Sequence, residues 1–259
     1  MRLNLGYKAL AAAVALAAAS GAFANTSLDV PNPGSIYLNV YDSAAAQSFV
    51  FDTGLTQSTF NAANNYSFSF AGDPNWAAFV AGEKAGDTIQ YSVVAGSKTS
   101  SSSLAFSTAQ TQPGIAPDQN KITSAATAIG QYGQGVNLVT SSTTTTSLTT
   151  GGTQSTPSYY GSVQPTWASS LTITDLAVAG NSIGFFSFLA TSPRSTSAGT
   201  TAAFDGSWLL NGTSLTWTST IPTPLPAPWV LLLSAVALMG VIARRGKFDS
   251  STGMPELTA

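Results

Sequence analysis

The eleven residues SWLLNGTSLTW, Ser207–Trp217, indicate the fold more clearly than any other stretch of the chain. Their Asn211-Gly212 pair tolerates the positive φ values of a type I′ turn, so the sequence predicts a two-residue β-hairpin centred on that pair. The cross-strand pairs expected in this register are Leu210–Thr213 and Trp208–Leu215. The large apolar side chains on the shared face are Trp208, Leu210, Leu215 and Trp217. An antiparallel sheet with an aromatic core follows from this pattern.

The same alternation of apolar and polar residues recurs through the chain between residues 25 and 218. In residues 36–41, Ile36, Leu38 and Val40 point to one face, and Tyr37 and Tyr41 point to the other. The other predicted strands are residues 48–52, 66–70, 89–93, 104–107, 171–178 and 184–189. Aromatic side chains at this spacing are more often sheet core than ligand platforms.

Two short helices are expected to interrupt the strands. Asp73-Pro74 supplies an N-cap and a first-turn proline, Trp76, Phe79 and Val80 follow at helical spacing, and Gly82 ends the helix. A second helix begins at Asp118 and is expected to break at Gly133 and Gly135. The residues expected on its buried side are Ile122, Ala126, Ile129 and Tyr132. The predicted fold class is therefore mainly β, an antiparallel β-sandwich-like domain with two short helices.

Residues 140–157, TSSTTTTSLTTGGTQSTP, are rich in hydroxyl side chains and poor in apolar ones. The ordinary interpretation is a flexible loop. A glycosylated or sugar-contacting patch is the functional alternative.

The composition narrows the chemistry that the chain can perform. Charged residues make up 8% of the 259 residues, and the chain contains neither cysteine nor histidine. Disulfides, thiolate metal sites and the usual proton-transfer side chain are thereby excluded. No catalytic, cofactor-binding or metal-binding residue is assigned, and no cofactor is expected. Residues 25–228 carry nine acidic and four basic side chains, a net charge of about −5, so nucleic acid is not an expected partner.

The first 24 residues have the three parts of a secretory signal peptide. Arg2 and Lys8 form a basic region, residues 9–19 are uncharged and apolar, and Ala22 and Ala24 are the small residues that a signal peptidase recognises. Cleavage is expected after Ala24, and the domain at residues 25–218 is expected to be exported.

Near the C-terminus, residues 229–243 form an uncharged apolar segment. As a helix it is about 22 Å long, somewhat short for a hydrocarbon core of about 30 Å. Trp229 lies at one end and Arg244 and Arg245 at the other, as interfacial and cytoplasmic residues do. The sequence predicts one transmembrane helix, preceded by a proline-rich spacer at residues 219–228 and followed by a basic cytoplasmic tail at residues 244–259.

This tail resembles the PEP-CTERM sorting domain in its VPLPA form. The residues that carry the resemblance are Pro224, Leu225, Pro226, Ala227, Arg244 and Arg245. The resemblance covers only the C-terminal segment. It implies an exported protein of an exopolysaccharide-producing Gram-negative bacterium. An exosortase-type enzyme would process the tail after a stage in the inner membrane. A simple tail-anchored periplasmic protein is the alternative.

For the exported domain, a non-enzymatic structural or adhesive role at the cell surface or in the extracellular matrix is the first hypothesis. Its expected partners are the processing enzyme, the membrane and an exopolysaccharide. A lectin-like module is the alternative, and it would need exposed aromatic rings beside Asn or Asp. The candidate rings are Trp76, Trp167, Tyr159 and Tyr160. A secreted hydrolase, the third alternative, would need two carboxylates that converge in a cleft.

Overall fold

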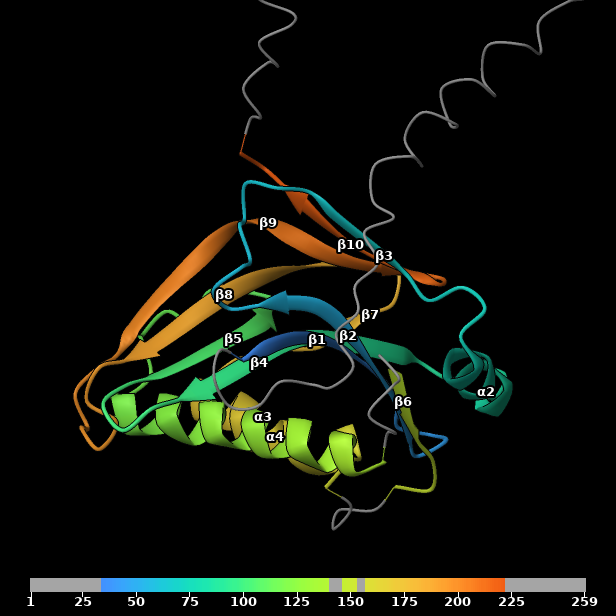
Figure 1. Cartoon of the computed structure of the whole chain (residues 1–259), viewed down its shortest axis with the longest axis horizontal. Helices are drawn as coiled ribbons and strands as arrows, with labels where there is room; N and C mark the ends of the chain where they lie inside the picture. The colour runs from blue at the N-terminus through green and yellow to red at the C-terminus, as the bar shows by residue number, and fades with distance from the viewer. Residues whose placement is uncertain (1–33, 140–145, 153–156, 222–259) are drawn as a thin grey trace, which may run out of the picture. The chain divides into compact units, whose positions relative to one another are not determined.

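A computed structural model describes residues 34–139, 146–152 and 157–221 (Figure 1). These residues form one antiparallel sheet of ten strands, accompanied by three helices. The strand order is β3-β10-β9-β8-β5-β4-β1-β2-β6, and β7 pairs with β4 outside this path. The strands are β1 (Ser35–Asp42), β2 (Gln47–Thr56), β3 (Tyr66–Ser69), β4 (Ile89–Lys98), β5 (Ser103–Ala109), β6 (Thr146–Thr149), β7 (Ala177–Val178), β8 (Ser182–Ala190), β9 (Thr200–Asn211) and β10 (Ser214–Ser219). The helices are α2 (Pro74–Gly82), α3 (Gln119–Val139) and α4 (Tyr160–Leu171).

The hairpin is present as β9 and β10, but its predicted register is wrong. Leu210 pairs with Leu215 and Trp208 pairs with Trp217, so the turn lies one residue later than expected. Asn211 ends β9, and Gly212 in the turn has a φ of 56°. The shift leaves the side-chain alternation unchanged, and all four predicted face residues are buried, as expected. The observed register places tryptophan opposite tryptophan and leucine opposite leucine, which keeps the large rings in contact.

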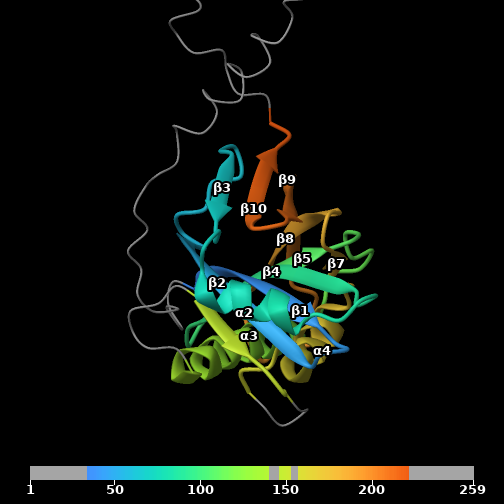
Figure 2. The same cartoon turned by 90° about the vertical axis from the view of Figure 1, so that its right-hand side faces the viewer.

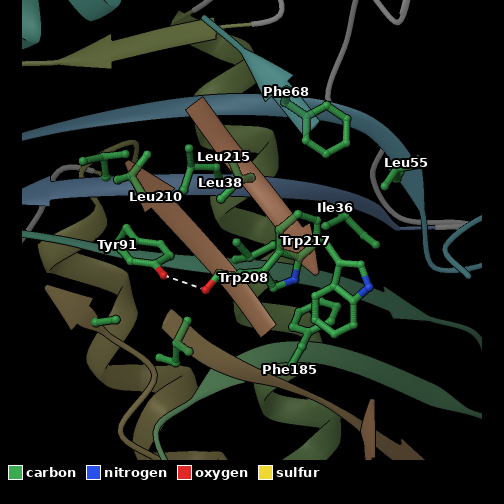
Figure 3. Close-up of a cluster of buried hydrophobic side chains, with 14 of the residues drawn as sticks. Ile36, Leu38, Leu55, Phe68, Tyr91, Phe185, Trp208, Leu210, Leu215 and Trp217 are labelled. Carbon is green, nitrogen blue, oxygen red and sulfur yellow. Dashed lines mark hydrogen bonds between the residues drawn. The ribbon is translucent and has the colours of Figure 1, made fainter. Parts of the chain in front are cut away.

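The sheet curls, so that β9, β10 and β3 lie over the face formed by β1, β2 and β4 (Figures 1 and 2). The expectation of a mainly β, antiparallel domain is confirmed. One continuous curled sheet replaces the two facing sheets of a sandwich. Its concave side holds the larger aromatic core, in which Trp208 and Trp217 lie beside Ile36 and Phe185 (Figure 3). The Tyr91 hydroxyl on β4 donates to the backbone carbonyl of Trp208 on β9, at 2.9 Å, and ties the two sides of the curl together.

Phe60, in the connection between β2 and β3, lies among five other aromatic rings of this core. Its ring centroid lies between 5.2 and 6.1 Å from those of five other rings. The five neighbours are Tyr66, Phe185, Phe204, Trp208 and Trp217. Because these rings come from β3, β8, β9 and β10, one loop side chain joins strands from the whole curled half of the sheet.

The two faces of β1 enter two separate cores, as the alternation predicts. Ile36, Leu38 and Val40 lie in the concave core, whereas Tyr37 belongs to a second core beneath α3 and α4. On that convex side the Tyr37 hydroxyl donates to the Ile129 carbonyl of α3 at 2.7 Å. The sheet is thus buried on both faces along β1.

The first predicted helix is confirmed as α2. The Asp73 carboxylate accepts the Trp76 amide at 2.9 Å, and Pro74 occupies the first turn. The side chain of Asp73 thereby satisfies one of the amides that a helix leaves without an intrahelical partner.

The second predicted helix is α3, and its predicted end is wrong. Ile122, Ala126, Ile129 and Tyr132 are buried, as expected. The helix continues through Gly133 and Gly135 to Val139. A Cβ at Gly135 would lie 3.0 Å from the Pro157 carbonyl oxygen, so this glycine serves close packing rather than helix termination.

Three further expectations need correction. Residues 160–171, for which no helix was expected, form α4, with Pro165 inside it. The strand expected over residues 171–178 reduces to β7, because Leu171 ends α4 and Thr172 takes a left-handed conformation at its C-cap. Within the predicted loop at residues 140–157, Thr146–Thr149 forms β6 and pairs with β2.

Candidate functional site

The sorting and signal residues lie outside the described residues. This applies to Ala22 and Ala24 and to the motif Pro224, Leu225, Pro226, Ala227, Arg244 and Arg245. The predicted transmembrane segment at residues 229–243 also lies outside them. Within the ranges that are described, no helix is both long and apolar enough to cross a membrane.

The aromatic rings considered for sugar stacking are mostly inside the protein. Trp167 and Tyr160 are fully buried, and Tyr159 is 6% exposed. Trp76 is half-buried, and its indole packs against Phe70 and Phe79, with centroid distances of 4.7 and 5.5 Å. Three of the four rings are therefore buried in the core, and part of the surface of the fourth, Trp76, is covered by packing against Phe70 and Phe79.

Tyr160 and Trp167 converge instead on a buried carboxylate. Asp175 Oδ2 accepts from the Tyr160 hydroxyl at 3.0 Å and from Trp167 Nε1 at 2.9 Å. Asp175 Oδ1 accepts from Gln164 Nε2 at 2.5 Å, and the Tyr160 hydroxyl also lies 2.5 Å from Ser92 Oγ on β4. All three donors to the carboxylate come from α4, so the network fastens that helix to the strand face and to the segment before β7.

Burial sets the protonation of this network. Desolvation raises the pKa of Asp175, and the three donated hydrogen bonds oppose that shift. Burial also raises the pKa of the Tyr160 hydroxyl, and the neighbouring Asp175 charge adds to the effect. Shifted pKa values often mark active sites, but structural networks produce them too. Since Asp175 has no exposed surface, this network holds the helix in place rather than presenting a group to a substrate.

Two other buried carboxylates serve local turns. Asp42 Oδ1 accepts the amides of Ala44 and Ala45 at 2.9 and 3.0 Å. Asp52 Oδ1 accepts the Gly54 amide at 2.9 Å. Among the residues that the structure describes, no group of three or more acidic side chains is placed to hold a metal ion.

The open surface of the described domain is hollowed beside α3. One hollow, of about 780 Å³, lies between the β4–β5 turn, the first turns of α3 and the β8–β9 connection. All of its lining residues except Pro193 have polar side chains, and two of them, Lys98 and Arg194, are among the few cations of the domain. Figure 1 shows these three segments together at one end of the sheet. We call this hollow the cationic groove.

A second hollow of about 290 Å³ continues along α3 and shares Lys98 with the cationic groove. The α3 side chains along the two hollows recur at helical spacing and are uncharged hydrogen-bonding groups. They are Asn120, Ser124, Thr127, Gln131 and Gln134, which we call the α3 polar stripe. Thr127 is partly exposed and the other four are exposed. From its first to its last residue the stripe spans about 21 Å of helix.

The stripe lies opposite the buried side of α3 that the sequence predicts. Its polar residues recur at helical spacing, so the sequence alone predicts that they share one exposed face. A polar face at this spacing does not by itself indicate a binding site, because an exposed helix face is polar in most proteins. The cationic groove depends on the β8–β9 connection, about seventy residues further along the chain, and the second hollow depends on the end of β4, so no local pattern indicates either of them.

Comparisons with protein-family models, with curated proteins and with solved structures find no match for this chain.

Proposed function

We propose that this chain is an exported, non-enzymatic structural or adhesive protein of the cell surface or extracellular matrix. In this proposal the C-terminal segment directs sorting by an exosortase-type enzyme, and the domain at residues 34–221 contacts hydrated exopolysaccharide. The observation that carries the second part is the α3 polar stripe, an exposed row of hydroxyl and amide groups beside open hollows.

The chemistry of the stripe suits a polysaccharide. Sugar hydroxyls both donate and accept hydrogen bonds, and Asn, Gln, Ser and Thr side chains can match both roles. The Ser124 and Thr127 hydroxyls already donate to backbone carbonyls one turn earlier, at 2.9 and 2.7 Å, which leaves their oxygens free to accept. A contact of this kind needs no tightly enclosed pocket, and it can repeat along a polymer.

The alternative of a lectin-like module with a stacking aromatic receives less support. Of the four candidate rings only Trp76 has appreciable exposure, and its neighbours in the core cover part of it. Sugar contact through hydrogen bonds on α3 is the better supported version of a carbohydrate-binding role.

Cell fractionation tests the proposal. We expect the chain in the surface or matrix fraction of cells that make the polysaccharide, and its release to the medium when the polysaccharide locus is deleted. Mass spectrometry of the mature chain should show loss of residues 246–259. A chain that keeps these residues and stays in the inner membrane under both conditions would instead be a simple tail-anchored protein, and the proposal would be wrong.

A further inference from the structure

The basic side chains of the domain are unevenly distributed. The described residues contain eight acidic and four basic side chains, a net charge of about −4. Lys98 and Arg194 line the cationic groove, and Lys121 lines the neighbouring hollow at the start of α3. Three of the four cations therefore gather at one end of an otherwise acidic domain.

Neither cation of the groove is neutralised within the described part of the chain. Lys98 and Arg194 are both exposed, and no acidic side chain lines the groove beside them. The remaining lining is dominated by hydroxyl and amide groups, including Ser100, Asn120 and Ser192. Such a groove offers full positive charges and uncharged hydrogen-bonding groups side by side.

Hydrogen bonds hold the walls of the groove in place. Gln119 Oε1 accepts the amides of Thr191 and Ser192 at 2.9 and 2.7 Å, and the Asn120 amide donates to the Ser195 carbonyl at 3.0 Å. These bonds fasten the β8–β9 connection, which carries Arg194, to the first turn of α3.

The wall that carries Lys98 is closed by a second set of bonds. In the β4–β5 turn, the Thr99 amide donates to the Ser102 carbonyl at 2.8 Å and the Ser102 amide donates to Thr99 Oγ1 at 3.0 Å. Because both walls are fixed by hydrogen bonds, the site is preformed, and little free energy would be lost in ordering these loops when a ligand binds.

We infer that the cationic groove binds an acidic polysaccharide through the carboxylates of its uronic acid units. This inference rests on the proposed function and names the class of polysaccharide. Lys98 and Arg194 face the carboxylates, and the α3 polar stripe takes the hydroxyls of the sugar units that follow. The groove lacks large apolar side chains, which an acyl chain or an apolar peptide would require.

Affinity measurements on the mature chain test the inference, with polygalacturonate as the acidic probe and dextran as the neutral one. The wild-type chain should bind polygalacturonate more tightly, and the preference should fade as salt screens exposed charges. The double variant Lys98→Gln/Arg194→Gln should lose about tenfold in affinity for polygalacturonate, since exposed ionic contacts contribute up to about fivefold each. Its dextran binding should not change.

Lys84→Gln is the control for the single variant Lys98→Gln, because each removes one cation and Lys84 does not line the groove. An equal loss of polygalacturonate binding in this control would overturn the inference, since net charge alone would then set the affinity. Tighter binding to phosphatidylglycerol vesicles than to polygalacturonate would also overturn it and would assign the groove to a membrane surface. Equal binding of both polysaccharides refutes the uronate preference but leaves the proposed function intact, whereas binding of neither refutes the polysaccharide contact itself.

Discussion

Replacement of Asp175 by alanine tests whether the buried network holds α4 on the sheet. The carboxylate accepts from three α4 side chains, and two of them, Tyr160 and Trp167, are fully buried. In Asp175→Ala, the Trp167 indole N–H loses its acceptor without access to water, which costs about 1–3 kcal/mol. Tyr160 keeps Ser92 as a partner, and Gln164 can reach solvent.

The cavity left by the carboxyl group adds about 1 kcal/mol, so a loss of about 3 kcal/mol in unfolding free energy is expected. For a domain of this size the melting temperature should fall by roughly 10 °C. Urea unfolding followed by tryptophan fluorescence measures the change directly. A loss below about 1 kcal/mol would show that α4 is held by packing alone and would refute the reasoning.

Asp175→Asn separates charge from geometry. The asparagine oxygen can accept from Tyr160 and Trp167 if its amide group faces Gln164, whose own amide then turns over. The expected loss is at most about 1 kcal/mol, because the loss of charge-assisted hydrogen bonds is opposed by relief of the desolvation that raises the pKa of Asp175.

The pH dependence has a definite sign. The pKa of Asp175 is raised in the folded protein, so the folded state holds its proton more tightly than the unfolded chain does. Its contribution is therefore fully present below the unfolded pKa of about 3.9 and is lost as pH rises through the raised folded value. The advantage of the wild type over Asp175→Asn should shrink over that interval. The pKa of Glu83 is also raised, mainly by desolvation, but this residue is present in both proteins and cancels in the difference.

Three further substitutions probe other parts of the fold. Asn39 is fully buried on β1, and both polar atoms of its side-chain amide lack a hydrogen-bond partner among the described residues. Asn39→Val should therefore raise the unfolding free energy by about 1 kcal/mol. A lower melting temperature for this variant would contradict the prediction. Gly96→Ala would bring a Cβ to 2.6 Å from the Ala126 carbonyl oxygen, so its unfolding free energy, measured in urea, should fall by about 1–3 kcal/mol. Gly114 has open space around it, so the control Gly114→Ala should leave the unfolding free energy nearly unchanged. Asp73→Ala removes the α2 N-cap and should cost about 1 kcal/mol. Amide exchange should become faster in that helix and in β6, whose Thr146 hydroxyl donates to the same carboxylate at 2.8 Å, and unchanged exchange in α2 would argue against the cap.

Local pattern was sufficient to predict which side chains of the hairpin and of β1 are buried. The observed turn lies one residue later, which changes each cross-strand pair by two residues, so Trp208 keeps its predicted face. A one-residue change in pairing would have turned the side chains of one strand to the other face. The register depends on which residues meet across the strands, and the preference of Asn-Gly for a turn was outweighed by that pairing.

The errors in the helices have a tertiary origin. Glycine is unfavourable inside a helix, yet α3 passes Gly135 because the chain at Pro157 approaches there too closely for a side chain. Residues 160–171 contain Pro165 and few strong helix formers, but Tyr160, Trp167 and Leu171 recur at helical spacing and are fully buried. That spacing indicates a helix with one buried side, so α4 could have been predicted from the sequence. The donors to Asp175 lie 8 to 15 residues before it, but the contact of Tyr160 with Ser92 spans 68 residues. That contact and the cationic groove join segments far apart in the chain and could not be predicted from local sequence.

The position of β10 determines how the domain responds to mechanical load. This strand ends at Ser219, and it lies between β9 and β3 with hydrogen-bonded ladders on both sides. Any tension carried by the chain beyond residue 221 reaches the domain through β10, where two ladders and the two core side chains Leu215 and Trp217 resist it together. A protein tethered by its C-terminal end would thus be pulled at an interior strand of the sheet, and extraction of that strand would have to break both ladders.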